Sequence, residues 1–134
     1  MSYKRLEHTA DVEVLVEADS LESLFCDSLD AMVEIMGPEK KGDKSTNRTV
    51  SIGSIDLTAL LIDFLSEVLA LSEINNEYYE VEKIQFMNEN RVEVVLAGRP
   101  IETFSEDIKA VTYHEADVVQ DKDGKWSTKI IFDI

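Results

Sequence analysis

The residues best suited to chemistry in this sequence lie in three short segments. They are residues 7–12, residues 109–115 and residues 132–134. Both histidines of the chain, His8 and His114, fall in the first two segments. In the third, Asp133 lies beside the terminal carboxylate that Ile134 carries if it ends the chain. Two negative groups this close repel each other unless a cation or a basic partner lies between them.

A site for a hard divalent cation is the chemistry that these residue types favour. Asp11 begins one predicted strand and Asp133 ends another, so their carboxylates meet at one edge of a sheet if the two strand ends lie side by side. With the terminal carboxylate of Ile134 they would offer the oxygen ligands that Ca²⁺, Mg²⁺ and Mn²⁺ prefer. The alternative is that Asp11 caps a turn and Asp133 hydrogen-bonds to backbone.

The other polar residues of these segments give weaker signals. His8 and His114 could be ligands, although a histidine is more often a hydrogen-bonded residue in the second shell behind a ligand. Lys109 could neutralise the carboxylates, reach an anion of a partner, or be merely exposed. The sequence gives little support for zinc binding or nucleophilic catalysis, because the histidines are far apart and the single Cys26 lies in an apolar helical pattern.

Length and charge narrow the class of protein. The 134 residues, 44% of them hydrophobic, predict one domain spanning 1–134. A net charge of −15 repels phosphate, so we expect no direct high-affinity binding to nucleic acid, and it favours a cation or a basic protein partner. There is no apolar run of about 20 residues and no signal-peptide pattern. With a single cysteine, these features predict a cytoplasmic protein without membrane contact.

Hydrophobic periodicity predicts two helices. Valines alternate with more polar residues from 12 to 17, as in a strand, and Asp19 is then expected to cap a helix together with Glu22. This helix should end at Gly37-Pro38. After a predicted strand, Arg48–Gly53, Asp56 is expected to cap the second helix. Asp56, Asp63 and Glu67 share one line of that helix, most simply as a solvated flank.

The second half of the sequence is rich in strand patterns. Residues 79–87 and 91–98 predict one hairpin, and residues 110–119 and 125–132 predict another. Asp121-Lys122-Asp123-Gly124 has the chemistry of a hairpin turn rather than of a complete calcium loop. Together the elements predict an α+β fold, a two-layer sandwich in which two helices pack on one face of a mostly antiparallel or mixed sheet.

The three segments resemble the signature segments of the archease family. The residues that carry the resemblance are Glu7-His8-Thr9-Ala10-Asp11-Val12, Lys109-Ala110-Val111-Thr112-Tyr113-His114 and Ile131-Phe132-Asp133-Ile134. Residues 56–69 are similar to the second helix of the family, and the match runs through essentially the whole chain in the same order.

The resemblance implies an accessory protein rather than an enzyme. Archeases activate the RtcB-type RNA ligase, which joins tRNA exon halves in tRNA splicing and RNA repair with GTP and Mn²⁺, and they promote its guanylylation and multiple turnover. For this chain the resemblance implies a metal site at Asp11, Asp133 and the terminal carboxylate of Ile134. It also implies that Lys109 takes part in activating the partner.

The sequence departs from the family pattern in places, and other functions stay open. Phe64 and Ser66 stand where the family often has Trp and Asn, and residues 99–107 form a shorter stretch that lacks a His. One alternative is a stand-alone metal-dependent hydrolase that uses the same carboxylates with His8 or His114 as base. Another is an acidic, chaperone-like adaptor that needs no metal.

Overall fold

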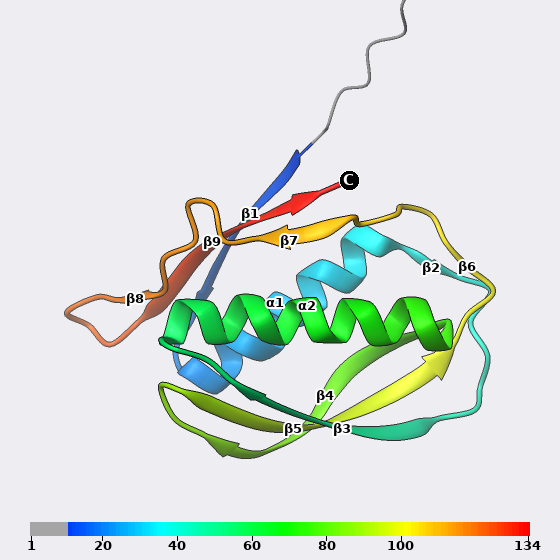
Figure 1. Cartoon of the computed structure of the whole chain (residues 1–134), viewed down its shortest axis with the longest axis horizontal. Coiled ribbons are helices and arrows are strands. Elements are labelled where there is room, and N and C mark those ends of the chain that lie inside the picture. Colours follow the sequence, from blue (N-terminus) through cyan, green and yellow to red (C-terminus); the bar gives the residue numbers. More distant parts are fainter. Residues whose placement is uncertain (1–10) are drawn as a thin grey trace, which may run out of the picture.

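The computed structural model describes residues 11–134, and Figure 1 shows their arrangement. The elements, in chain order, are β1 (Asp11–Ala18), α1 (Leu21–Met36), β2 (Pro38–Glu39), β3 (Thr46–Gly53), α2 (Leu57–Asn75), β4 (Glu77–Met87), β5 (Arg91–Pro100), β6 (Thr103–Phe104), β7 (Ala110–Thr112), β8 (Val119–Gln120) and β9 (Trp126–Asp133). The predicted α+β fold class is confirmed. His8 lies outside the described residues.

The strands of this range pair only in antiparallel fashion, in three sheets. One sheet has the order β1-β9-β7, with β8 also on β9, the second has the order β3-β5-β4, and β2 pairs with β6. The sequence pattern suggested a single sheet, whereas the described strands form three separate sheets. Both helices contact strands of the two larger sheets and lie between them in Figure 1.

Helix α1 begins one residue later than the sequence predicted. The N-cap is Ser20, whose side chain accepts a hydrogen bond from the backbone N–H of Ser23, so the predicted cap at Asp19 is wrong. Asp and Ser are about equally good N-caps, which is why the pattern did not separate them. The predicted end is confirmed, since Gly37 adopts the left-handed conformation with φ of 57°.

Helix α2 is buried on a wider surface than one stripe. Asp56 caps it as predicted, by accepting a hydrogen bond of 2.8 Å from the backbone N–H of Ala59. Its buried apolar residues include the consecutive residues Leu60, Leu61 and Ile62 as well as Phe64, Leu65, Val68 and Leu69, so they cover more than one face. A helix that contacts strands on two sides needs this broader apolar surface. Neither described helix has the length and apolar character needed to cross a membrane.

The first predicted hairpin is confirmed as β4 and β5, and the second is interrupted. The turn before β9 forms as expected, because the side chain of Asp121 accepts hydrogen bonds from the backbone N–H groups of Asp123 and Lys125. The predicted strand 110–119, however, is split into β7 and β8. The residues between leave β9 and bond to α2, where the N–H of Val118 donates to the hydroxyl of Thr58.

Candidate functional site

The end of β9 brings the predicted site segments together. Asp133 pairs with Asp11 of β1 on one side and with Ala110 of β7 on the other. The backbone N–H of Lys109 donates a 2.7 Å hydrogen bond to the carbonyl oxygen of Asp133. The expectation that the strand ends of Asp11 and Asp133 lie side by side is therefore confirmed. Figure 1 shows the chain end between β1 and β7.

The sheet geometry places the two carboxylates on one face. Residues directly opposite each other in an antiparallel pair point to the same side, so Asp11 and Asp133 do so. Neighbouring residues point to the other side, where Phe132 is fully buried and Ile134 packs against the core. The apolar neighbours therefore anchor the end of β9 and hold the acidic pair where β1 begins and β9 ends.

The two carboxylates of this pair influence each other's ionisation. The pKa of Asp11 is raised, chiefly because its carboxyl shares a hydrogen bond with that of Asp133, with further contributions from burial and from the charge of Asp133. The charge of His114 acts in the opposite direction. Within residues 11–134, no lysine or arginine forms an ion pair with either aspartate. A cation between the two carboxylates would relieve their repulsion.

Side chains alone do not complete a metal site here. Among the described residues, there is no group of three or more His, Cys, Asp or Glu side chains that could hold a metal ion. Asp11 and Asp133 supply hard oxygen donors of the kind that Mg²⁺, Mn²⁺ and Ca²⁺ accept. The residues present therefore fit an open site, which needs water, a main-chain carboxylate or a partner to complete its coordination.

Lys109 takes part in two features of the structure. Its backbone N–H donates a hydrogen bond to the carbonyl oxygen of Asp133, and the residue also lines a cavity of about 260 Å³ beside α2, together with Ser66 and Ala70. Of the two departures from the family pattern, Ser66 thus lies in this cavity, whereas Phe64 is buried against Phe25. His114 is exposed beyond the end of β7.

Sequence reasoning missed the contacts of Asp63. This residue was expected on a solvated flank of the helix, but its carboxylate accepts a 2.6 Å hydrogen bond from the hydroxyl of Ser54 and another from the hydroxyl of Tyr113. The second bond raises the pKa of Tyr113. Asp63 therefore fastens the segment after β7 to α2. No local pattern signals such a contact, because Asp63 and Tyr113 are fifty residues apart.

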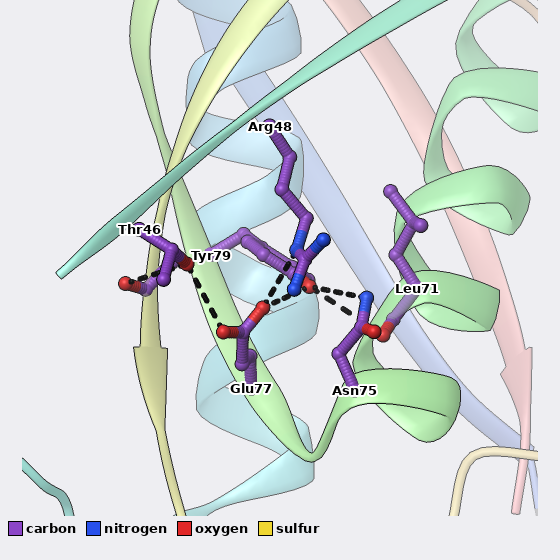
Figure 2. Close-up of polar contacts among 7 residues, drawn as sticks. Thr46, Arg48, Leu71, Asn75, Glu77 and Tyr79 are labelled. Carbon is purple, nitrogen blue, oxygen red and sulfur yellow. Dashed lines mark hydrogen bonds and ion pairs between the residues drawn. The ribbon is translucent and has the colours of Figure 1, made fainter. Parts of the chain in front are cut away.

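A second polar cluster, shown in Figure 2, is closed by its own hydrogen bonds. The carboxylate of Glu77, which is 6% exposed, receives hydrogen bonds from Arg48 at 2.8 Å, Tyr79 at 2.7 Å and Thr46 at 3.0 Å. Burial alone would raise the pKa of Glu77, but these three hydrogen bonds outweigh it and lower the pKa. Because both oxygens are satisfied, this cluster stabilises the fold and offers no open binding site.

Comparisons with known proteins agree with the architecture. The Archease protein family (MTH1598/TM1083) model matches residues 3–134. The chain is 31% identical to the protein archease of Methanosarcina acetivorans over 98% of this chain and 95% of that protein. For the protein archease of Pyrococcus abyssi, the identity is 27% and the alignment covers 98% of each chain.

Two solved structures share the fold. The crystal structure of an archease from Thermotoga maritima, described as a possible chaperone, superposes with a TM-score of 0.72 at 21% identity over 100% of this chain and 98% of that one. The solution structure of protein 1598 from Methanobacterium thermoautotrophicum gives a TM-score of 0.73 at 26% identity over 96% of each chain. With the family match over almost the whole sequence, these comparisons show that this chain belongs to the archease family.

Proposed function

We propose that this chain is a non-catalytic activator of an RtcB-type RNA ligase and that it acts through a divalent cation. The proposed ligands are Asp11, Asp133 and, where Ile134 ends the chain, its terminal carboxylate. The observation that carries the metal site is the pairing of Asp11 with Asp133, which raises the pKa of Asp11. Membership in the archease family supports an RtcB-type RNA ligase as the partner, because activation of that ligase is what the resemblance to archeases implies.

The roles of the remaining residues follow from their positions. A bound cation would supply positive charge at the edge of an otherwise acidic sheet. Lys109 positions Asp133 through its N–H and is proposed to reach an anionic group of the ligase with its ammonium. His114, whose charge acts on Asp11, is proposed to support that carboxylate from outside the metal's coordination shell.

The net charge of the chain also bears on which partner it binds. With a net charge of −15, the chain would be attracted to a basic protein surface and repelled by RNA. We therefore propose that it binds the ligase rather than the tRNA, in the cytoplasm, and speeds its guanylylation and multiple turnover in tRNA splicing.

The first test is ligase guanylylation with GTP and Mn²⁺. We expect Asp11→Asn and Asp133→Asn each to reduce the stimulation of the ligase at least about tenfold, because each removes a charged ligand. Lys109→Met should reduce it while leaving Mn²⁺ affinity unchanged. The matched control is Glu89→Gln, which removes one negative charge from the exposed turn between β4 and β5.

The outcomes of this assay separate the functions. Full stimulation by both aspartate variants would contradict a role of the metal site in activation. Turnover of a phosphoester by the chain alone, abolished in Asp11→Asn, would instead identify a metal-dependent hydrolase. Binding to the ligase with no binding of Mn²⁺ or Ca²⁺ by calorimetry would identify an adaptor without a metal.

Extending the chain tests the third proposed ligand. Adding two glycines after Ile134 converts its carboxylate into an amide, and we expect this variant to bind Mn²⁺ at least about tenfold more weakly, because a charged oxygen ligand is lost. The same two residues placed before Met1 serve as the control. Equal Mn²⁺ affinity in calorimetry for the extended and unextended chains would remove Ile134 from the site.

A further inference from the structure

Two neighbouring cavities lie along α2. The first has a volume of about 220 Å³ and the second about 260 Å³. They share Leu69 and Glu73 of α2 as wall residues, and their opposite walls come from the consecutive residues Ile108 and Lys109. We call this continuous surface the α2 groove. Its walls are formed by α2 and by residues 103–111.

The α2 groove has an apolar floor. Met36, Leu69 and Ile108 line it and are 2%, 7% and 1% exposed, so each is fixed in the packed core. Both cavities have room for apolar side chains of a partner, and the apolar floor favours such side chains over a charged ligand.

The wall opposite α2 is held at both ends by backbone hydrogen bonds. Near its start, the N–H groups of Ser105 and Glu106 donate to the carbonyl oxygens of Gly37 and Met36, at 2.9 and 3.1 Å. Near its other end, the N–H of Lys109 donates to Asp133. The groove is thus preorganised, and binding a segment in it requires little ordering of the chain itself.

The charges around the groove select the partner. Three acidic residues, Glu73, Glu106 and Asp107, line the groove, against one basic residue, Lys109. Within the described part of the chain, none of these four side chains forms an ion pair with another residue. Unpaired acids beside an apolar floor complement a segment that carries Lys or Arg next to an apolar residue.

We propose that the α2 groove is a docking site for an extended segment of the protein partner. An apolar side chain of that segment inserts between Leu69 and Ile108, and flanking Lys or Arg residues face Glu73 and Asp107. This inference rests on the proposed function for the identity of the partner. It adds an anchoring surface that does not include the carboxylates of the metal site and adjoins them through Lys109 and Ala110.

The test measures binding of the purified RtcB-type ligase from the same organism. We expect Glu73→Lys/Asp107→Lys to raise the Kd at least about tenfold and to weaken its dependence on salt. Ala70→Trp, which fills the groove without changing charge, should also raise the Kd. Both variants should keep the melting temperature and Mn²⁺ affinity of the wild type. The control Glu82→Lys/Glu89→Lys makes the same charge change at exposed residues of the β4–β5 hairpin.

Each result separates the docking site from the ligase proposal. If the wild type binds the ligase and the groove variants bind it as tightly as the control does, the docking site is wrong. If the wild type itself does not bind the ligase, the proposed function is wrong and the groove loses the partner proposed for it. If the wild type is a dimer that Glu73→Lys/Asp107→Lys dissociates, a second copy of the chain occupies the groove, which also overturns the proposal.

Discussion

An Asp133→Asn variant is expected to lose most of the thermal stabilisation that Mn²⁺ gives the wild-type chain. A ligand that binds only the folded state at about 100 times its Kd stabilises that state by about 2.7 kcal/mol, which for a chain of this length raises the melting temperature by about 8 °C. Asp133 lies between β1 and β7 and is paired with the other proposed side-chain ligand, so its loss should remove this gain.

Without metal, substituting Asp11 should affect the melting temperature differently. Because the pKa of Asp11 is raised in the folded state, its ionised form is disfavoured at neutral pH, and this cost disappears as the pH falls through the raised pKa. Asp11→Asn removes the repulsion and should leave the metal-free melting temperature unchanged or higher at pH 7. Differential scanning calorimetry with and without Mn²⁺ measures both effects.

The control for this experiment is Glu89→Gln, which should retain the full Mn²⁺ effect. Equal stabilisation by Mn²⁺ in the wild type and in Asp133→Asn would place the cation elsewhere. A lower metal-free melting temperature in Asp11→Asn would show that its carboxylate stabilises the fold, as expected if Asp11 caps a turn, which is the alternative that the sequence left open.

Glu77→Gln is expected to lower the free energy of unfolding by about 3 kcal/mol, which corresponds to a fall in melting temperature of about 10 °C. The amide cannot accept hydrogen bonds at both positions where the carboxylate does, so Arg48 loses its ion pair and one donor of the cluster loses its partner. Urea denaturation measures the change. The control Glu80→Gln alters an exposed residue of the same strand and should cost less than about 0.5 kcal/mol.

The effect of Glu77→Gln should depend on pH with a known sign. Since the pKa of Glu77 is lowered in the folded state, its contribution is complete above the unfolded-state pKa of about 4.3 and is lost as the pH falls through the folded-state value. The difference between wild type and variant should therefore be constant near pH 7 and shrink in acid below about pH 4. A difference that grows in acid would contradict this account of the cluster.

Local patterns in the sequence were sufficient for the helices and for the β4–β5 hairpin. Repeats of three and four residues marked α1 and α2, and Asp56 and Gly37 marked ends that need a capping side chain or a left-handed backbone. The sorting of strands into separate sheets depends on long-range pairing, such as that of β1 with β9 across almost the whole chain. Alternating hydrophobicity does not encode which strands pair.

For the site residues too, local sequence patterns did not reveal contacts between distant segments. That Asp11 and Asp133 could meet was inferred from their places at strand ends, and the register confirms that they are opposite each other. Glu77 gave no signal, because its partners Thr46 and Arg48 come from another strand. The cavity beside Lys109 was equally hidden, since its walls come from α2 and from residues about forty positions later.

Paramagnetic broadening by Mn²⁺ in a ¹⁵N–¹H correlation spectrum tests the proposed metal site most directly. At substoichiometric Mn²⁺, the amide signals of Asp11, Val12, Ala110 and residues 132–134 should broaden first. Those of the acidic turn 121–124 and of Asp56 at the start of α2 should persist, and Asp133→Asn should abolish the early broadening. Broadening that begins at the turn or spreads evenly over the acidic surface would contradict a cation held by Asp11 and Asp133.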